Sequence, residues 1–304
     1  MRRIALVSPL AFALALGACS STPEAVTLAP PVTAVAHVDM DADAYANANL
    51  NAVLWVQSSA EYDAAALSAY HAAAGRLDAA LADKAWDALA PGARANPDAI
   101  ATLPPAVILD VDETVLDNSP YQARLVRDGG VYDEATWAAW VEERSARPVP
   151  GVLDFARAAT ARGVTLVYLS NRAEHLQDAT LDNLRAVGLP VANESVFLGL
   201  GTVVEGCEQQ GSEKDCRRQL AGRQYRVLMQ FGDQLGDFVA VEDNTPAARQ
   251  ALVDRHADWF GDRWWMLPNP TYGGWEPAVF DNDWGLPLEA RRAAKRAALD
   301  TGGR

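Results

Sequence analysis

The stretch Ala106–Asn118, with the sequence AVILDVDETVLDN, decides the fold of this chain of 304 residues. Its first four residues are apolar, which is typical of a short strand buried on both faces within a parallel sheet. The strand ends at Asp110 and Asp112, two acids that are costly to bury unpaired. A helix N-cap needs one such residue, whereas this segment has three carboxylates within four positions. Since ligands of open α/β sheets bind at the carboxyl ends of the strands, the acids predict an active site there.

The order Asp110-x-Asp112-x-Thr114 after an apolar strand resembles the first motif of the haloacid dehalogenase (HAD) superfamily. The longer string DVDETVLDNSPY, residues 110–121, resembles class C acid phosphatases, a group that includes a bacterial outer-membrane lipoprotein and 5'-nucleotidases. The resemblance implies a Rossmann-like α/β fold, in which helices flank a parallel sheet beside a small, mainly helical accessory region. It also implies that Asp110 is the nucleophile, forming an aspartyl-phosphate, and that Asp112 is the general acid and base. An acid at position 112 favours phosphatases and mutases over dehalogenases and P-type ATPases.

Two further segments supply the second and third motifs of the superfamily. The apolar strand Val164–Ser170 ends in Ser170-Asn171-Arg172, and we expect a catalytic role for Ser170 and substrate binding by Asn171 and Arg172. The third motif needs a lysine, for which Lys214 in GSEKDCRRQL is the candidate by position. Arg217 and Arg218 are its competitors.

The fourth motif follows the strand Arg226–Phe231, in the sequence FGDQLGDF. Gly232 is interpreted as the residue that lets the backbone turn at the strand tip. Together with the first motif, this segment predicts a Mg²⁺ site, because magnesium prefers a few carboxylates, water and substrate phosphate. The predicted metal ligands are Asp110, Asp112, Asp233 and Asp237. Members of the resembled family often carry Asn and Asp where this chain has Gln234 and Gly236.

Two aromatic residues match positions where family members sandwich a base or aryl group. Trp137 lies in an insert, residues 119–150, which we expect to form a substrate wall with a short helix that begins near Asp133. Tyr272 lies in LPNPTYGGWEP, which resembles the PNxxYGGWE element of the family. The resemblance therefore implies an acid phosphatase that acts on 5'-nucleotides and other small phosphomonoesters.

Composition narrows the classes of partner. Half of the residues are hydrophobic, which indicates a globular protein, and the formal net charge of −14 argues against a nucleic acid polymer as the partner. The four histidines form no HxH or HExxH pattern, which argues against a histidine-ligated zinc site. His256, beside Arg255, is interpreted as part of a surface pair.

The amino-terminal sequence MRRIALVSPLAFALALGACS has the charged start and short apolar run of a secretory signal. Leu16–Cys19 resembles a bacterial lipobox, so we expect a signal peptide over residues 1–18 and a lipid on Cys19. Residues 19–40 are expected to be a flexible tether, and residues 41–304 a phosphatase domain that begins with helices over 41–100. These features predict a protein of the bacterial cell envelope, anchored through lipid, with Ser20 favouring the outer membrane. The oligomeric state stays open.

With Cys19 assigned to lipid, Cys207 and Cys216 are left as a pair in an oxidising compartment, and we predict a disulfide between them. They flank the segment that contains Lys214. Two other functions are compatible with the same fold: a catalytically silent ligand-binding lipoprotein, and a structural lipoprotein of the envelope.

Overall fold

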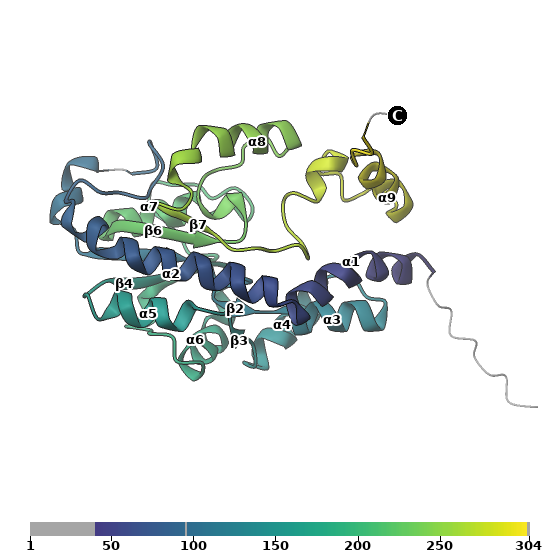
Figure 1. Ribbon diagram of the computed structural model, residues 1–304, viewed down its shortest axis with the longest axis horizontal. Helices are drawn as coiled ribbons and strands as arrows, with labels where there is room; N and C mark the ends of the chain where they lie inside the picture. The colour runs from purple at the N-terminus through teal and green to yellow at the C-terminus, as the bar shows by residue number, and fades with distance from the viewer. Residues whose placement is uncertain (1–39, 95, 303–304) are drawn as a thin grey trace, which may run out of the picture. The chain divides into compact units, whose positions relative to one another are not determined.

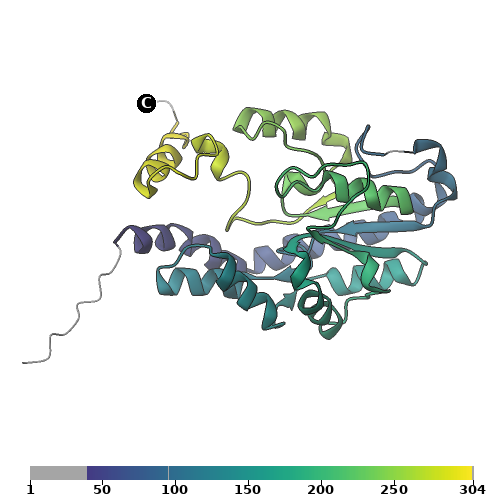
Figure 2. The same cartoon turned by 180° about the vertical axis from the view of Figure 1, so that it is seen from behind.

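The computed structural model describes residues 40–94 and 96–302. Five parallel strands form the central sheet, in the spatial order β5-β4-β1-β6-β7 (Figures 1 and 2). Their bounds are β1 Pro105–Leu109, β4 Thr165–Ala173, β5 Phe197–Leu200, β6 Arg226–Gly232 and β7 Trp264–Met266. The predicted α/β fold class is confirmed. Because β1 lies between β4 and β6, the carboxyl ends of these three strands, which carry Asp110, Ser170 and Asp233, are neighbours.

Side chains of β1 alternate between the two faces of the sheet, as the period of a strand requires. Val107 and Leu109 join the larger apolar cluster, whereas Ala106 and Ile108 join a second cluster on the opposite face. All four are buried, so β1 is the doubly covered strand that its sequence predicts.

Helices cover both faces of the sheet. Helices α2 (Ala60–Ala82) and α5 (Val152–Thr160) pack together on one face, and α7 (Asp215–Gln224) lies against β4 and β6 on the other (Figure 1). Tyr70 of α2 stacks on Phe231 with ring centroids 5.1 Å apart. Its hydroxyl donates to the Thr114 carbonyl over 2.7 Å, which fixes α2 to the segment that follows β1.

A mainly helical accessory region adjoins the sheet. It contains α1 (Met40–Ser58), which packs on α3 (Ser119–Asp128), and α4 (Glu134–Glu142). The Asp133 side chain caps α4 by accepting from the backbone amides of Ala135 and Thr136. A two-stranded antiparallel ribbon closes the insert. The remaining elements are β2 (Leu116–Asp117), β3 (Arg147–Pro148), α6 (Gln177–Ala186), α8 (Pro246–Arg255), α9 (Leu288–Ala297) and the 3₁₀ helices η1 (Pro97–Thr102), η2 (Glu174–Leu176), η3 (Glu194–Val196), η4 (Leu235–Asp237), η5 (Ala257–Trp259) and η6 (Pro277–Phe280).

Two features differ from the sequence interpretation, and a third set of predictions is not tested by the structure. Strand β5 has no counterpart among the predicted strands. The surface assignment of His256 is wrong, because its ring is buried against Trp259 and Trp264, with centroids 5.8 and 4.7 Å away. The predicted signal peptide, Cys19 and nearly all of the predicted tether lie outside the described residues.

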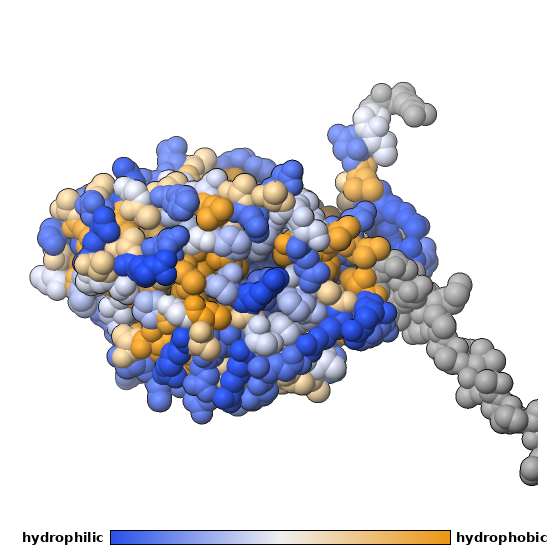
Figure 3. All heavy atoms as spheres, turned by 60° about the horizontal axis from the view of Figure 1, so that its bottom comes forward, coloured by the Kyte–Doolittle hydropathy of each residue, from blue (hydrophilic) through white to orange (hydrophobic). Residues whose placement is uncertain are grey.

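Over the described part of the chain, no helix combines the length and apolar character needed to cross a membrane. Hydrophobic residues on the face drawn in Figure 3 are scattered among hydrophilic ones, as is usual for a protein surface.

Candidate active site

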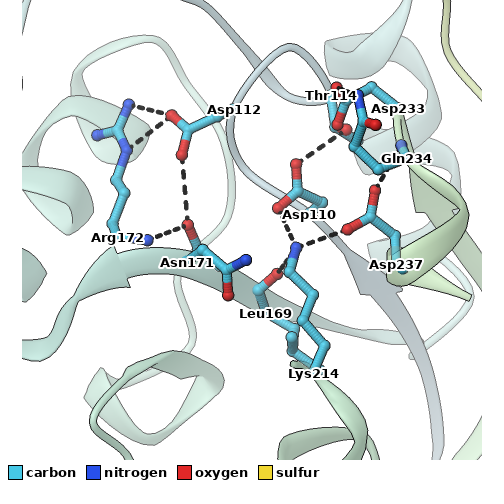
Figure 4. A network of polar contacts seen from close by, with 12 residues as sticks. Asp110, Asp112, Thr114, Leu169, Asn171, Arg172, Lys214, Asp233, Gln234 and Asp237 are labelled. Atoms are coloured by element: carbon cyan, nitrogen blue, oxygen red, sulfur yellow. Dashed lines mark hydrogen bonds and ion pairs between the residues drawn. The ribbon is translucent and has the colours of Figure 1, made fainter. Parts of the chain in front are cut away.

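The predicted motifs meet at the carboxyl edge of the sheet. Asp110 directly follows β1, Ser170 and Arg172 lie in the last residues of β4, and Asp233 directly follows β6. Lys214 immediately precedes α7, and Asp237 ends η4. Figure 4 shows Asp110, Lys214 and Asp237 pointing toward one another from their separate elements, with Asp112 and Arg172 facing each other beside them.

Lys214 is the centre of the cluster. Its Nζ lies 2.5 Å from Asp110 Oδ1, 2.7 Å from Asp237 Oδ1 and 3.1 Å from the Leu169 carbonyl oxygen. An ammonium group has three hydrogens to donate, so all three are used. Burial alone would lower the pKa of Lys214, but Asp110 and Asp237 raise it above its ordinary value. Lys214 is thus a charged group with a fixed position.

Three carboxylates crowd around this single ammonium. Asp110, Asp233 and Asp237 each place an oxygen within 4.8 Å of the others. Burial raises the pKa of Asp110 to about 7, although Lys214 acts in the opposite direction. Burial, Asp237 and Asp110 together raise the pKa of Asp233 well above its ordinary range. Three carboxyl groups thus share one ammonium, and a divalent cation that prefers oxygen ligands fits the donor set.

Asp112, the fourth predicted metal ligand, is not part of the three-carboxylate group. Its carboxylate faces Arg172, whose Nε and Nη2 lie 2.9 and 2.8 Å from Oδ1 (Figure 4). Asn118 Nδ2 donates to the same oxygen over 2.9 Å, and Ser170 Oγ lies 3.5 Å from Oδ2. The side chain predicted to transfer protons is therefore held in place by Arg172 and Asn118.

The predicted substrate residues lie in different surroundings. Asn171 is exposed, whereas Arg172 is buried, with its guanidinium 5.6 Å from the ring centroid of Trp137. Trp137 is half-buried and also contacts Tyr121 edge to face. The Tyr272 hydroxyl donates to the carboxylate of Glu113, the neighbour of Asp112 in the sequence. Both aromatic rings are thus connected to the side of the site where Asp112 lies.

Three residues that hydrogen-bond to the aspartates of the site are not among the predicted site residues. Thr114 Oγ1 donates to Asp110 Oδ2 over 3.1 Å, and Asn269 Nδ2 donates to Asp233 Oδ2 over 2.7 Å. Gln234 donates to Asp233 through its side chain and to Asp237 through its backbone amide, each over 2.8 Å. Thr114 belongs to the first motif, and Gln234 is at a position where this chain differs from the family, so the sequence offered a reason to consider both. For Asn269 the only such reason is that it lies in the same segment as Tyr272.

Gly232 is required for a reason other than the predicted one. A Cβ atom there would lie 2.2–2.5 Å from side-chain atoms of Asp237, closer than real Cβ contacts come. The glycine therefore makes room for the Asp237 carboxylate beneath Lys214.

The competitors of Lys214 bond elsewhere. Arg217 and Arg218 are buried, and in the described part of the chain neither donates to a carboxylate of the three-carboxylate group. Arg217 donates to the Ser170 carbonyl and Arg218 to the Gly236 carbonyl, each over 2.5 Å. Cys207 and Cys216 are joined by a disulfide, with Cα atoms 5.5 Å apart. Since Cys216 lies in the first turn of α7, the bond ties the start of this helix to the loop before Lys214.

An aspartate after the central strand, a second aspartate two residues later and a buried lysine between carboxylates define a HAD-type hydrolase. A family model for the HAD superfamily, subfamily IIIB (acid phosphatase), matches residues 12–275, and the chain belongs to that family. It superimposes on the class C acid phosphatase of Bacillus anthracis with a TM-score of 0.72 and 32% identity, covering 85% of this chain and 99% of that one.

Two plant proteins are more distant relatives. Vegetative storage protein 2 of Arabidopsis thaliana is 25% identical over 166 residues, which are 54% of this chain and 55% of that protein. Acid phosphatase 1 of Solanum lycopersicum is 26% identical over 132 residues, 43% of this chain and 51% of that protein. The chain thus spans about half the length of these relatives.

The disulfide generates a prediction about Lys214. Replacing both Cys207 and Cys216 with serine should lower the melting temperature, because closing so short a loop stabilises by about 2.5–3 kcal/mol on the chain-entropy model. It should also lower turnover of a phosphomonoester, because the loop that carries Lys214 becomes freer to move. Calorimetry and steady-state kinetics measure the two effects, and added magnesium should not restore turnover. Free thiols at both positions in exported protein, found by mass spectrometry, would contradict the prediction.

Proposed function

We propose that the protein is a Mg²⁺-dependent phosphomonoesterase that acts through an aspartyl-phosphate, with 5'-nucleotides and other small phosphomonoesters as substrates. The observation that carries the proposal is the position of Lys214, whose buried ammonium bridges Asp110 and Asp237 at the end of the central strand. A surface lysine that merely pairs with acids does not bring together the ends of β1 and β6. Family membership as an acid phosphatase supports the same reaction class.

The proposed first step forms a bond between an Asp110 carboxylate oxygen and phosphorus, while the bond from phosphorus to the leaving oxygen breaks. Asp112 gives its proton to that oxygen, so the product leaves as an alcohol. In the second step Asp112 takes a proton from water, which attacks phosphorus and releases inorganic phosphate from Asp110. Lys214 and Ser170 orient the phosphoryl oxygens and, in the case of Lys214, offset their charge.

Asp110, Asp233 and Asp237 are the side chains that would hold the magnesium ion. When bound, the ion neutralises phosphoryl charge and orients the transferred group. Gln234 and Asn269 position Asp233 through hydrogen bonds, and the backbone amide of Gln234 positions Asp237. Asp112 is not among the side chains that would hold the ion, because its carboxylate faces Arg172.

We expect Asp110→Asn to abolish turnover of p-nitrophenyl phosphate, because the amide is isosteric but cannot form the acyl-phosphate. Asp112→Asn should slow turnover by roughly 10²–10⁴, as typical for loss of a general acid. Asp78→Asn is the matched control, since Asp78 lies on the surface and pairs with Arg162. Acid quenching with labelled substrate should trap phosphate on the wild type and on the Asp78→Asn control, but not on Asp110→Asn. Comparable turnover by wild type and Asp110→Asn would favour the silent-binding or structural alternatives.

The substrate preference generates a second prediction. Stacking on an aromatic ring contributes about 1–3 kcal/mol per base in other base-binding sites. The double substitution Trp137→Ala, Tyr272→Ala should therefore raise the KM for nucleoside monophosphates much more than the KM for glycerol phosphate. Glycerol phosphate serves as the internal control, because loss of Trp137 also uncovers Arg172 and affects both substrates. Equal losses on both substrates would mean that the rings only pack.

We also propose that the mature protein is anchored to the outer membrane of a bacterial envelope by lipid on Cys19. The support is the lipobox-like segment that ends at this cysteine. Cys19→Ala should abolish incorporation of labelled palmitate and move the phosphatase activity from the membrane fraction to the soluble fraction. Palmitate labelling that persists in the variant would refute the assignment of the lipid to this residue.

A further inference from the structure

Arg217 is fully buried and contacts Asn171, one of the predicted substrate-binding residues. Its Nη2 lies 2.7 Å from Asn171 Oδ1, and the same nitrogen lies 3.1 Å from the carbonyl oxygens of Ser212 and Glu213. Its Nη1 donates to the Ser170 carbonyl. One guanidinium therefore joins the end of β4 to the two residues that precede Lys214.

This contact fixes which end of the Asn171 amide is turned outward. A guanidinium only donates, so the group that meets it must be the carbonyl oxygen of the amide. The Asn171 Nδ2 is consequently directed away from Arg217, and no hydrogen bond of this nitrogen to another described residue is present. Because Asn171 is exposed, the amide has a donor free for an oxygen atom that arrives from solvent.

The cost of burying Arg217 indicates that the contact matters. Burial lowers the pKa of Arg217 to about 10, with Asp110 and Asp237 acting in the opposite direction, so the group stays charged at neutral pH. Its Nε is buried without a hydrogen-bond partner. Burying a charged side chain with an unsatisfied donor costs free energy, and an apolar side chain would fill the same space behind the loop at a lower cost in free energy.

We propose that Arg217 is a positioning residue that orients the Asn171 amide to donate from Nδ2 to a phosphoryl oxygen of the substrate and that fixes the approach of the chain to Lys214. The inference rests on the proposed phosphatase function. It assigns Asn171 a specific atom for phosphate binding and assigns Arg217, which does not touch the substrate, the task of presenting that atom.

A double-mutant cycle tests the proposal. In the wild-type background, Asn171→Ala should lower kcat/KM for p-nitrophenyl phosphate about 10-fold, as expected for a hydrogen bond to a charged group. In the Arg217→Met background, the same Asn171→Ala change should lower kcat/KM less than about 2-fold, because the amide is no longer oriented. Arg217→Lys should recover part of the coupling, since it retains the charge and a donor.

Arg223→Met is the control, since Arg223 is an exposed arginine of the same helix that donates to the Glu205 carbonyl. In that background, Asn171→Ala should have its full effect. If Asn171→Ala lowers kcat/KM by the same factor in the Arg217→Met and Arg223→Met backgrounds, Arg217 only stabilises the fold and the inference is wrong. Melting temperatures identify the variants that fold. If Arg217→Met does not fold, the cycle is measured with Arg217→Lys in its place. If the wild type shows no turnover, the proposed function is contradicted. The same four variants are then compared by the Kd of inorganic phosphate, measured by calorimetry.

Discussion

The buried ion pairs of Lys214 are the interaction on which the rest of the site depends. Removing an ammonium group from water costs several kcal/mol, and only good geometry to its partners offsets that cost. Here the partners come from three strand ends: Asp110 after β1, the Leu169 carbonyl in β4 and Asp237 after β6. The ammonium therefore holds these three strand ends together at one edge of the sheet. The order of the strands, with β1 between β4 and β6, is what makes this possible.

The same arrangement leaves the site short of positive charge. Asp110, Asp233 and Asp237 carry three carboxylates against one ammonium, and burial raises the pKa of both Asp110 and Asp233. A monoester brings further negative charge, so three carboxyl groups beside one ammonium are by themselves a poor place to bind one. Asp112 is in a different environment, because its carboxylate forms an ion pair with the buried guanidinium of Arg172. The chain thus keeps two carboxylate environments a few residues apart, one suited to a cation and the other to proton transfer.

The sequence could predict the fold and the site wherever a local pattern carries the information. Four buried apolar residues followed by acids identify β1 and Asp110, because strand period and charge are local properties. The choice among Lys214, Arg217 and Arg218 is different, since it depends on the direction of each side chain around the first turn of α7. His256 shows the same limit, as its burial comes from Trp264 in a later strand. Gly232 was identified correctly as a special position, but its reason, the space needed by Asp237, exists only in three dimensions.

The start of α7 shows how a single helical turn can organise a site. Residues in an α-helix are about 100° apart around the axis, so consecutive side chains point in different directions. Just before the helix, Lys214 points to the strand ends, and within its first turn Cys216 is bonded to Cys207, Arg217 to the end of β4 and Arg218 to the turn that carries Asp237. The covalent bond restrains the loop on one side, and the two guanidinium groups restrain the helix against the sheet on the others. The position of Lys214 therefore depends on contacts made by four residues of the segment 214–218, and no single contact could provide it, because each fixes the helix in one direction only.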